Sequence, residues 1–184
     1  MGIGSLFGRG AAVRREVEHS RDALYRVAYA WCHDAQRADD LVHEAIEKAL
    51  RNAAQLRDAQ RVRGWVFRIL ANCLRDQQRA RREEIELEEV EEQLFAAGPT
   101  PEEAHASIEI AARVRQAIAR LPLGQRQVVT LVDLEGCTYA EVGEALEIPI
   151  GTVMSRLCRA RQALRGHLTP LAAEQAETKL RSVK

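Results

Sequence analysis

Hydroxyl and guanidinium side chains toward the C-terminal end of the chain have the types and spacing needed to bind DNA. Thr152, Ser155, Arg156 and Arg159 recur at intervals of three or four residues, which places them on one face of a helix. Short hydroxyls and arginines on such a face can hydrogen-bond base edges and phosphates in a major groove. The opposite stripe, which begins at Val153, is apolar and would face a core. The pattern predicts a recognition helix for duplex DNA.

A second polar face is expected earlier in the chain, where basic and amide side chains again recur three or four residues apart. Its members are Arg68, Asn72, Arg75, Asp76 and Arg79. Positive side chains can follow a phosphate backbone, and an amide can hydrogen-bond the edge of a base that has left the duplex. This combination favours single-stranded DNA.

The sequence carries no pattern typical of an enzyme or a metalloprotein. It has no Ser/His/Asp set, glycine-rich phosphate loop or paired carboxylates at catalytic spacing. The four cysteines are widely scattered, without zinc-ligand spacing, and are expected to be free thiols in a reducing cytosol. We therefore expect no catalytic residue, no metal and no cofactor. A redox role for Cys32 or Cys73, through disturbed packing, stays open as an alternative.

Helices must position these faces, because unbranched helix-forming residues dominate the composition and aromatic residues make up only 4% of it. This balance favours an all-α fold. In the N-terminal half, apolar residues at helical spacing predict two amphipathic helices that break near His33 and Asp34. A third helix is expected from about Arg61 to Arg82, so that three helices share one core.

Four shorter helices are expected in the C-terminal half. The first ends at residues 121–122, where a proline cannot continue a helix, and the second spans 125–134. Residues 138–141 have the spacing of a capping box, which starts the third helix. After a turn at 147–149, the fourth runs over 150–164 or slightly beyond. Two short helices joined by a tight turn, after two others, predict a helix-turn-helix domain.

Charge divides the chain into segments although the formal net charge is zero. Residues 1–82 carry 16 Lys/Arg against 10 Asp/Glu, and residues 104–184 carry 11 against 8. Between them, nine Asp/Glu and two prolines oppose a packed helix. We therefore expect one domain at 12–82, an acidic flexible linker at 83–103, a second domain at 104–168 and a tail at 169–184.

Segments that would direct the chain to a membrane are not evident in the sequence. No apolar run approaches the roughly 20 residues that span a bilayer. The first ten residues lack the charged start, apolar middle and cleavage site of a signal peptide. We expect a cytoplasmic protein without membrane insertion.

Both halves resemble bacterial extracytoplasmic-function (ECF) sigma factors, group IV of the sigma-70 family. Residues 24–26, 38–44 and 63–72 resemble sigma region 2. Residues 121–122, 125–126, 136–140 and 151–161 resemble sigma region 4. The last of these ranges has the sequence Gly-Thr-Val-Met-Ser-Arg-Leu-Cys-Arg-Ala-Arg. The two motif sets occur in the family's order, which is more specific than either set alone. The resemblance implies a three- to four-helix region 2 bundle and a region 4 helix-turn-helix domain, which together direct RNA polymerase to promoters.

The resemblance also implies roles for individual residues. The stretch with which the family binds a coiled coil of core RNA polymerase is occupied by Asp39, Asp40, Leu41 and Glu44, so the beta and beta-prime subunits are the implied partners. The polar face around Asn72 matches the stretch that captures a flipped base of the minus-ten element and holds the opened strand. The helix that reads the minus-thirty-five element as duplex DNA is matched by Thr152, Met154, Ser155, Arg156 and Arg159.

Two positions depart from the family pattern. Met154 stands where many relatives have Lys or Arg, which removes a phosphate or base contact, and Leu123-Gly124 replaces a polar pair. No large sensor domain is visible, so the resemblance implies control by a separate anti-sigma factor. The alternative is a stand-alone helix-turn-helix regulator with an N-terminal dimerisation domain. It explains residues 104–165 equally well, but leaves Asp39, Asp40 and Asn72 without a role.

Overall fold

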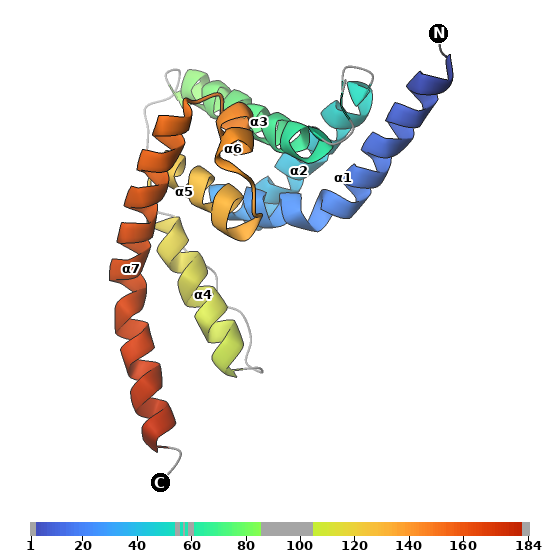
Figure 1. Cartoon of the computed structure of the whole chain (residues 1–184). Helices are drawn as coiled ribbons and strands as arrows, with labels where there is room; N and C mark the ends of the chain where they lie inside the picture. Colours follow the sequence, from blue (N-terminus) through green and yellow to red (C-terminus); the bar gives the residue numbers. More distant parts are fainter. Residues whose placement is uncertain (1–2, 54–55, 57, 59–60, 86–104, 182–184) are drawn as a thin grey trace.

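A computed structural model describes residues 3–53, 56, 58, 61–85 and 105–181, and every regular element in these ranges is a helix (Figure 1). The N-terminal half contains α1 (Ile3–Cys32), α2 (Ala35–Arg51) and α3 (Val62–Ile85). The C-terminal half contains α4 (His105–Ala119), α5 (Leu123–Val129), the π-helical turn η3 (Thr130–Leu134), α6 (Tyr139–Leu146) and α7 (Ile150–Arg181). The predicted all-α fold is confirmed.

The break between α1 and α2 lies where the sequence predicts it. His33 adopts a left-handed conformation, with φ of 54°, and its backbone N–H donates to Tyr29 O at 2.8 Å. The Asp34 side chain then accepts from Arg37 N at 2.8 Å and caps the start of α2. This cap satisfies one of the amide groups that a helix start leaves without a partner. The chain therefore turns sharply within two residues and brings α2 back against α1.

The helix-turn-helix is built by local capping, as the sequence predicts. Thr138 accepts from Glu141 N at 3.3 Å, while the Glu141 carboxylate accepts from Thr138 N at 2.7 Å, which completes the capping box of α6. The backbone N–H and the hydroxyl of Thr138 both donate to the Glu141 carboxylate and lower the pKa of Glu141 below its ordinary value. At the other end of α6, Glu147 has φ of 58° and ψ of 44°. This left-handed residue makes the tight turn into α7.

α7 extends farther than the sequence periodicity indicates. Its core-facing stripe consists of Val153, Leu157 and Ala160, which are buried, and Leu164, which is partly buried. The sequence predicts a helix over 150–164 or slightly beyond, and helical backbone continues to Arg181. An apolar stripe marks only the part of a helix that faces a core, whereas helix propensity can extend the helix further. The predicted tail at 169–184 is thus helical over the part that the structure describes.

The two halves pack directly on each other. Figure 1 shows α6 lying across α3, and contacts also join α1 to α4, α5 and η3. Phe67 and Leu70 of α3 belong to the same buried cluster as Leu131 of η3 and Val142 of α6. The sequence predicted two domains but gave no arrangement between them. Of the expected linker, α3 includes residues up to Ile85, and the remainder lies outside the described residues.

Candidate nucleic-acid interface

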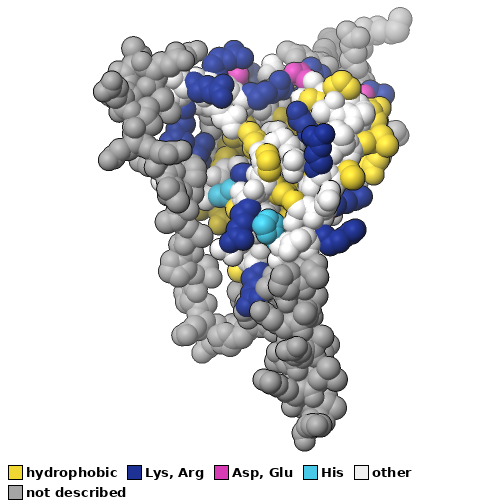
Figure 2. Space-filling view, turned by 90° about the vertical axis from the view of Figure 1, so that its left-hand side faces the viewer, with side chains coloured by type: hydrophobic (Ala, Val, Ile, Leu, Met, Phe, Trp, Pro, Cys, Tyr) yellow, Lys and Arg dark blue, Asp and Glu magenta, His cyan; other side chains and the backbone are white. Residues whose placement is uncertain are grey.

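The residues predicted to form a recognition face lie on α7, on the side away from its buried stripe. Ser155, Met154 and Arg159 are exposed, while Thr152 and Arg156 are partly buried. The face follows from the buried stripe described above, because burying one side of a helix directs the other side to solvent. Figure 2 shows the side of the molecule that carries α7, where Lys and Arg side chains are spread over the described surface with few acidic side chains among them. Such a surface suits a polyanion.

Two features of this face were not evident from the helical pattern. Ile150 and Met154 lie four residues apart and are 51% and 54% exposed. They form an exposed apolar patch on the helix, N-terminal to Arg156 and Arg159. Apolar side chains in a major groove contact the methyl group of thymine. Arg156, in turn, lies close to α5: a Cβ on Gly124 would lie 2.9 Å from its Nη1 atom. The glycine that departs from the family pattern therefore leaves room for this guanidinium.

The face predicted on α3 is also present, but it contacts the other half of the chain. Arg68 donates to Glu147 Oε1 at 2.8 Å, and Arg75 donates to Glu147 Oε2 at 2.8 Å. Arg75 also donates to the Asn72 side-chain oxygen. Hydrogen bonds from Arg75 and Arg68 hold the pKa of Glu147 below its ordinary value, so this carboxylate is ionised at neutral pH.

The remaining members of the α3 face lie toward its C-terminal part. Arg79 is exposed, and the Asp76 carboxylate lies 3.4 Å from Lys48 Nζ of α2. All five residues of this face therefore lie on one helix, and the side chains of Arg68, Asn72 and Arg75 are linked through hydrogen bonds.

The four residues predicted to bind polymerase divide into exposed carboxylates and a buried anchor. Asp39 and Asp40 are exposed on α2, whereas the Leu41 side chain is completely buried in the core. Glu44 is partly buried; its carboxylate lies 2.8 Å from Lys48 Nζ and accepts from Gln77 at 3.0 Å. Burial opposes ionisation of Glu44, but these contacts outweigh it and lower its pKa. Leu41 thus fixes the position of the helix that presents the two aspartates.

A buried carboxylate at the junction of the two halves was not anticipated by sequence reasoning. The Glu135 side chain is only 3% exposed, and its oxygens lie 3.1 Å from Arg26 Nη2 and 3.3 Å from Arg63 Nη2. Arg63 also donates to the Glu135 backbone oxygen. Two positive partners compensate the cost of removing this charge from water. No local pattern could have identified the contact, because Glu135 is 109 and 72 residues from its partners.

A second set of contacts joins α1 to the start of η3. Trp31 Nε1 donates to Thr130 Oγ1 at 2.8 Å, and Arg126 Nη1 donates to the Trp31 backbone oxygen at 2.8 Å. Burial, followed by the charge of Arg126, lowers the pKa of His33 to about 4. His33 is therefore neutral at physiological pH, near the partly buried side chain of Arg126. These contacts cross the junction in a largely dry environment, where hydrogen bonds are strong and lost partners are costly.

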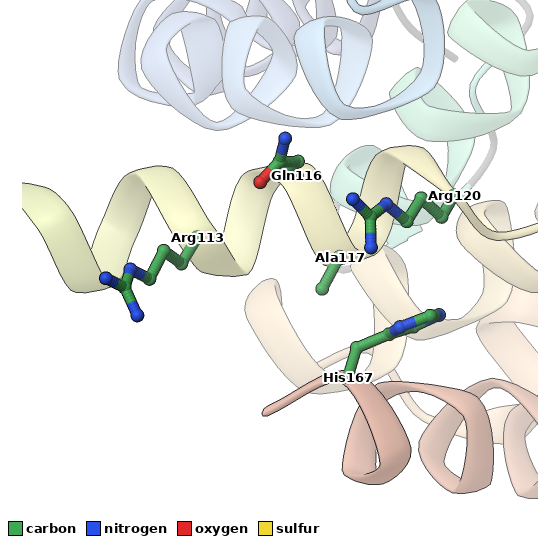
Figure 3. Close-up of a pocket in the computed structure, with 5 residues that line it drawn as sticks. All are labelled: Arg113, Gln116, Ala117, Arg120 and His167. Atoms are coloured by element: carbon green, nitrogen blue, oxygen red, sulfur yellow. The ribbon is translucent and has the colours of Figure 1, made fainter. Parts of the chain in front are cut away.

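An open hollow lies between α4 and α7, and Figure 3 shows the residues that line it. Arg113, Gln116, Ala117 and Arg120 come from α4, and His167 comes from α7. The lining is basic and contains no nucleophile, so it offers a surface for a polar or anionic group and no set of residues for catalysis.

The cysteines of the chain are free thiols, and three of the four are buried. Among the described residues, no group of three His, Cys, Asp or Glu side chains is arranged to hold a metal ion. Cys32, Cys73 and Cys137 are buried, and burial raises the pKa of both Cys73 and Cys137 to about 11. Cys158 is exposed on α7. A redox role through Cys73 would thus have to start from a buried thiol that is protonated at neutral pH. None of the described helices is both long and apolar enough to cross a membrane.

Two family models match the two halves that were distinguished above. The model of Sigma-70 region 2 matches residues 17–84, and the model of Sigma-70, region 4 matches residues 111–164. The predicted domains at 12–82 and 104–168 stay predictions in their exact bounds. Both candidate DNA faces lie within the matched residues.

Curated relatives extend over most of this chain. It is 30% identical over 164 residues to the ECF RNA polymerase sigma factor SigW of Bacillus subtilis, covering 84% of this chain and 88% of SigW. It is 33% identical over 165 residues to the ECF RNA polymerase sigma factor SigE of Mycolicibacterium smegmatis, covering 88% of this chain. The match covers 63% of that SigE, so the chain spans less than two thirds of this relative.

Solved structures show the same fold. The sigma factor RpoE of Bartonella quintana, crystallised with the anti-sigma factor NepR, has a TM-score of 0.73 and 25% identity, covering 85% of this chain and 96% of that one. CnrH, in complex with the cytosolic domain of CnrY, has a TM-score of 0.61 at 24% identity, covering 86% of this chain and 88% of that one. With both regions matched in order and relatives that extend across them, this chain belongs to the ECF RNA polymerase sigma factors of the sigma-70 family.

Proposed function

We propose that this protein binds core RNA polymerase in the cytoplasm and directs promoter-specific transcription initiation. The observation that supports the proposal is the presence of two separate polar, arginine-bearing faces, on α3 and α7, within the two matched sigma regions. A stand-alone regulator needs only the α7 face. The face with Asn72 gains a purpose when a strand must also be opened.

In the proposed mechanism, α7 docks in the major groove of the minus-thirty-five element. Ser155 and Arg159 are exposed for base and phosphate contacts, and Met154 adds an apolar contact. The α3 face then holds the separated strand of the minus-ten element through Asn72 and its neighbouring arginines, namely Arg68, Arg75 and Arg79, with Asp76 beside them. Binding energy alone stabilises the opened strand, because the flipped base gains hydrogen bonds that it could not make in the duplex.

Contact with polymerase is assigned to the exposed carboxylates of α2. Asp39 and Asp40 can pair with basic side chains of the beta-prime subunit, while Leu41 holds the helix in place from inside and Glu44 is held by Lys48. Exposed carboxylates at a protein interface contribute more to specificity and to the association rate than to total affinity.

Control by an anti-sigma factor forms part of the proposal. The support is that two solved structures of this fold are complexes with NepR and with the cytosolic domain of CnrY. An inhibitor of this kind would cover the α2 and α3 surfaces or the α7 surface. Affinity capture of the protein from its own cells under non-inducing conditions should retain such a partner.

Transcription from fragmented genomic DNA by bacterial core RNA polymerase tests the proposal. Discrete start sites should arise only when the protein is added, and they should share two upstream motifs. Asn72→Ala should abolish the starts while duplex binding persists, and the double variant Asp39→Asn, Asp40→Asn should weaken polymerase binding. Gln162→Ala, at an exposed position of α7, is the matched control. Duplex binding without any polymerase-dependent start would support the stand-alone regulator instead.

A further inference from the structure

The contact between α3 and the helix-turn-helix has the form of an occupied anion site. One carboxylate, that of Glu147, is held by two guanidiniums, with Arg68 Nη2 at 2.8 Å from Oε1 and Arg75 Nη1 at 2.8 Å from Oε2. Arg68 Nε adds a contact to Oε1 at 3.2 Å. Two guanidiniums converging on two oxygens form a geometry that accepts carboxylate and phosphate alike.

The position of Glu147 in the chain explains how its carboxylate reaches α3. Glu147 is the left-handed residue that ends α6, and its backbone N–H donates back to Gly143 O. Few residues other than glycine adopt this conformation readily, and asparagine is the usual exception. A glutamate here has no conformational advantage, so its side chain has to be explained by its contacts. Those contacts are Arg68 and Arg75.

We propose that Arg68 and Arg75 form a binding site for one backbone phosphate of the opened promoter strand, and that Glu147 fills this site in the free protein. The inference rests on the proposed function, because it concerns the same α3 face. It adds a competitor that the chain itself supplies: the strand must displace Glu147 before the two arginines can bind it.

The packing of the two halves supports displacement as a coupled event. α6 lies across α3, so a strand that follows α3 would meet α6 and its C-terminal residue (Figure 1). The two helices also approach each other at Gly64 of α3. A Cβ atom placed on Gly64 would lie 3.9 Å from Cβ and Cγ of Glu141 in α6. Because Glu147 ends α6, a movement of α6 away from α3 would also separate Glu147 from its arginines.

The expected size of the competition is modest. The three side chains are 51%, 44% and 41% exposed for Arg68, Arg75 and Glu147, so water and salt screen their attraction. Two such exposed pairs together correspond to roughly a fivefold difference in affinity for a competing anion. Raising the ionic strength should reduce this difference.

Binding of fluorescent random-sequence single-stranded DNA, measured by anisotropy, tests the competition. Glu147→Gln keeps the size of the side chain and removes its charge, and it should bind the strand about fivefold more tightly than the wild type. Glu144→Gln is the matched control, because Glu144 lies on the same helix and is 66% exposed, at 3.6 Å from Arg61. An equal gain in both variants would show a general charge effect and overturn the proposal.

A double variant separates this inference from the proposed function. Arg68→Gln with Arg75→Gln should weaken strand binding, and adding Glu147→Gln to it should give no further gain. If the two arginine changes leave strand binding unaltered, the assignment of the α3 face to the minus-ten strand is wrong. If they weaken binding but Glu147→Gln still strengthens it, the strand face stands and the role of Glu147 is refuted.

Distances between spin labels provide a measurement that does not depend on affinity. Cys158 is the exposed cysteine among four free cysteines, and Gln78 is exposed on α3. Labels on Cys158 and on a Gln78→Cys variant should report a single closed distance in the free protein. Saturating single-stranded DNA should lengthen it. An unchanged distance in the bound protein would overturn the movement of α6 as part of the displacement.

Discussion

The two faces proposed to bind DNA, on α7 and α3, have similar side chains but different surroundings. On α7, Ser155 and Arg159 are exposed, and the helix is oriented by its own buried stripe. On α3, Arg68 and Arg75 contact Glu147 from the other half of the chain. In the proposed mechanism, a face of the first kind is available to duplex DNA at once, whereas the second must first exchange a carboxylate for a phosphate. The two proposed faces would therefore be unequally accessible in the free protein.

Arg159→Ala should have the largest effect and should act on the α7 face alone. Losing a base or phosphate contact in the major groove costs about 2 kcal/mol, or roughly thirtyfold in duplex affinity. Anisotropy with a duplex that carries the minus-thirty-five motif measures this loss. Single-stranded DNA should bind as before. Equal losses for both ligands would mean that the two faces do not act separately, and Gln162→Ala provides the control.

Glu135→Gln should open the junction and thereby affect the α3 face alone. Glu135 is buried, whereas Arg26 and Arg63 are 60% and 45% exposed and can return to water. Loss of these charge-assisted hydrogen bonds should weaken the junction by about 1.5 kcal/mol. Single-stranded DNA should then bind more tightly, while duplex affinity stays constant. A higher affinity for duplex DNA as well would contradict the comparison. Thermal unfolding measures the stability that the variant loses.

His33 should make the junction sensitive to acid. Its pKa is about 4 in the folded protein and near 6.5 in an unfolded chain, so the unfolded state binds more protons between these values. The stability present above pH 6.5 is therefore lost progressively as the pH falls toward 4. The loss amounts to about 1 kcal/mol after allowance for partial exposure.

Urea unfolding of the wild type and of His33→Asn at several pH values measures this effect. Asparagine tolerates the left-handed backbone at this position and does not titrate. The variant should show a weaker dependence on pH between 6.5 and 4. His43→Asn, at an exposed position of α2, should behave as the wild type. If the free energy of unfolding depends on pH identically in the wild type and in His33→Asn, His33 does not cause the acid sensitivity.

Gly124→Ala should have the smallest effect and would sharpen the description of α7. The new methyl group would lie 2.9 Å from Arg156 Nη1, and the flexible guanidinium would have to move. Alanine in helix α5 should raise stability by about 0.5 kcal/mol. We expect duplex affinity to change by about twofold, as measured by anisotropy, because the position of Arg156 changes. An unchanged affinity would show that Arg156 does not act in duplex binding in its observed position.

The features that could be predicted from the sequence are those that local chemistry determines. The capping box at Thr138, the break after Cys32 and the recognition face of α7 depend on residues within a few positions of one another. The apolar stripe of α7 ends near Leu164, so it could not indicate that helical backbone continues to Arg181. Contacts of Glu135 and Glu147 with α1 and α3 join residues far apart in sequence, so no periodic pattern contains them.

The hydrogen bond from Trp31 to Thr130 places a fluorescent group at the junction. The indole of Trp31 is 3% exposed and donates across the junction at 2.8 Å. If the halves part, water replaces this partner, and the emission of the indole moves to longer wavelength as its surroundings become more polar. The protein thus carries an intrinsic optical signal for its own opening, which can be followed in time without any attached dye.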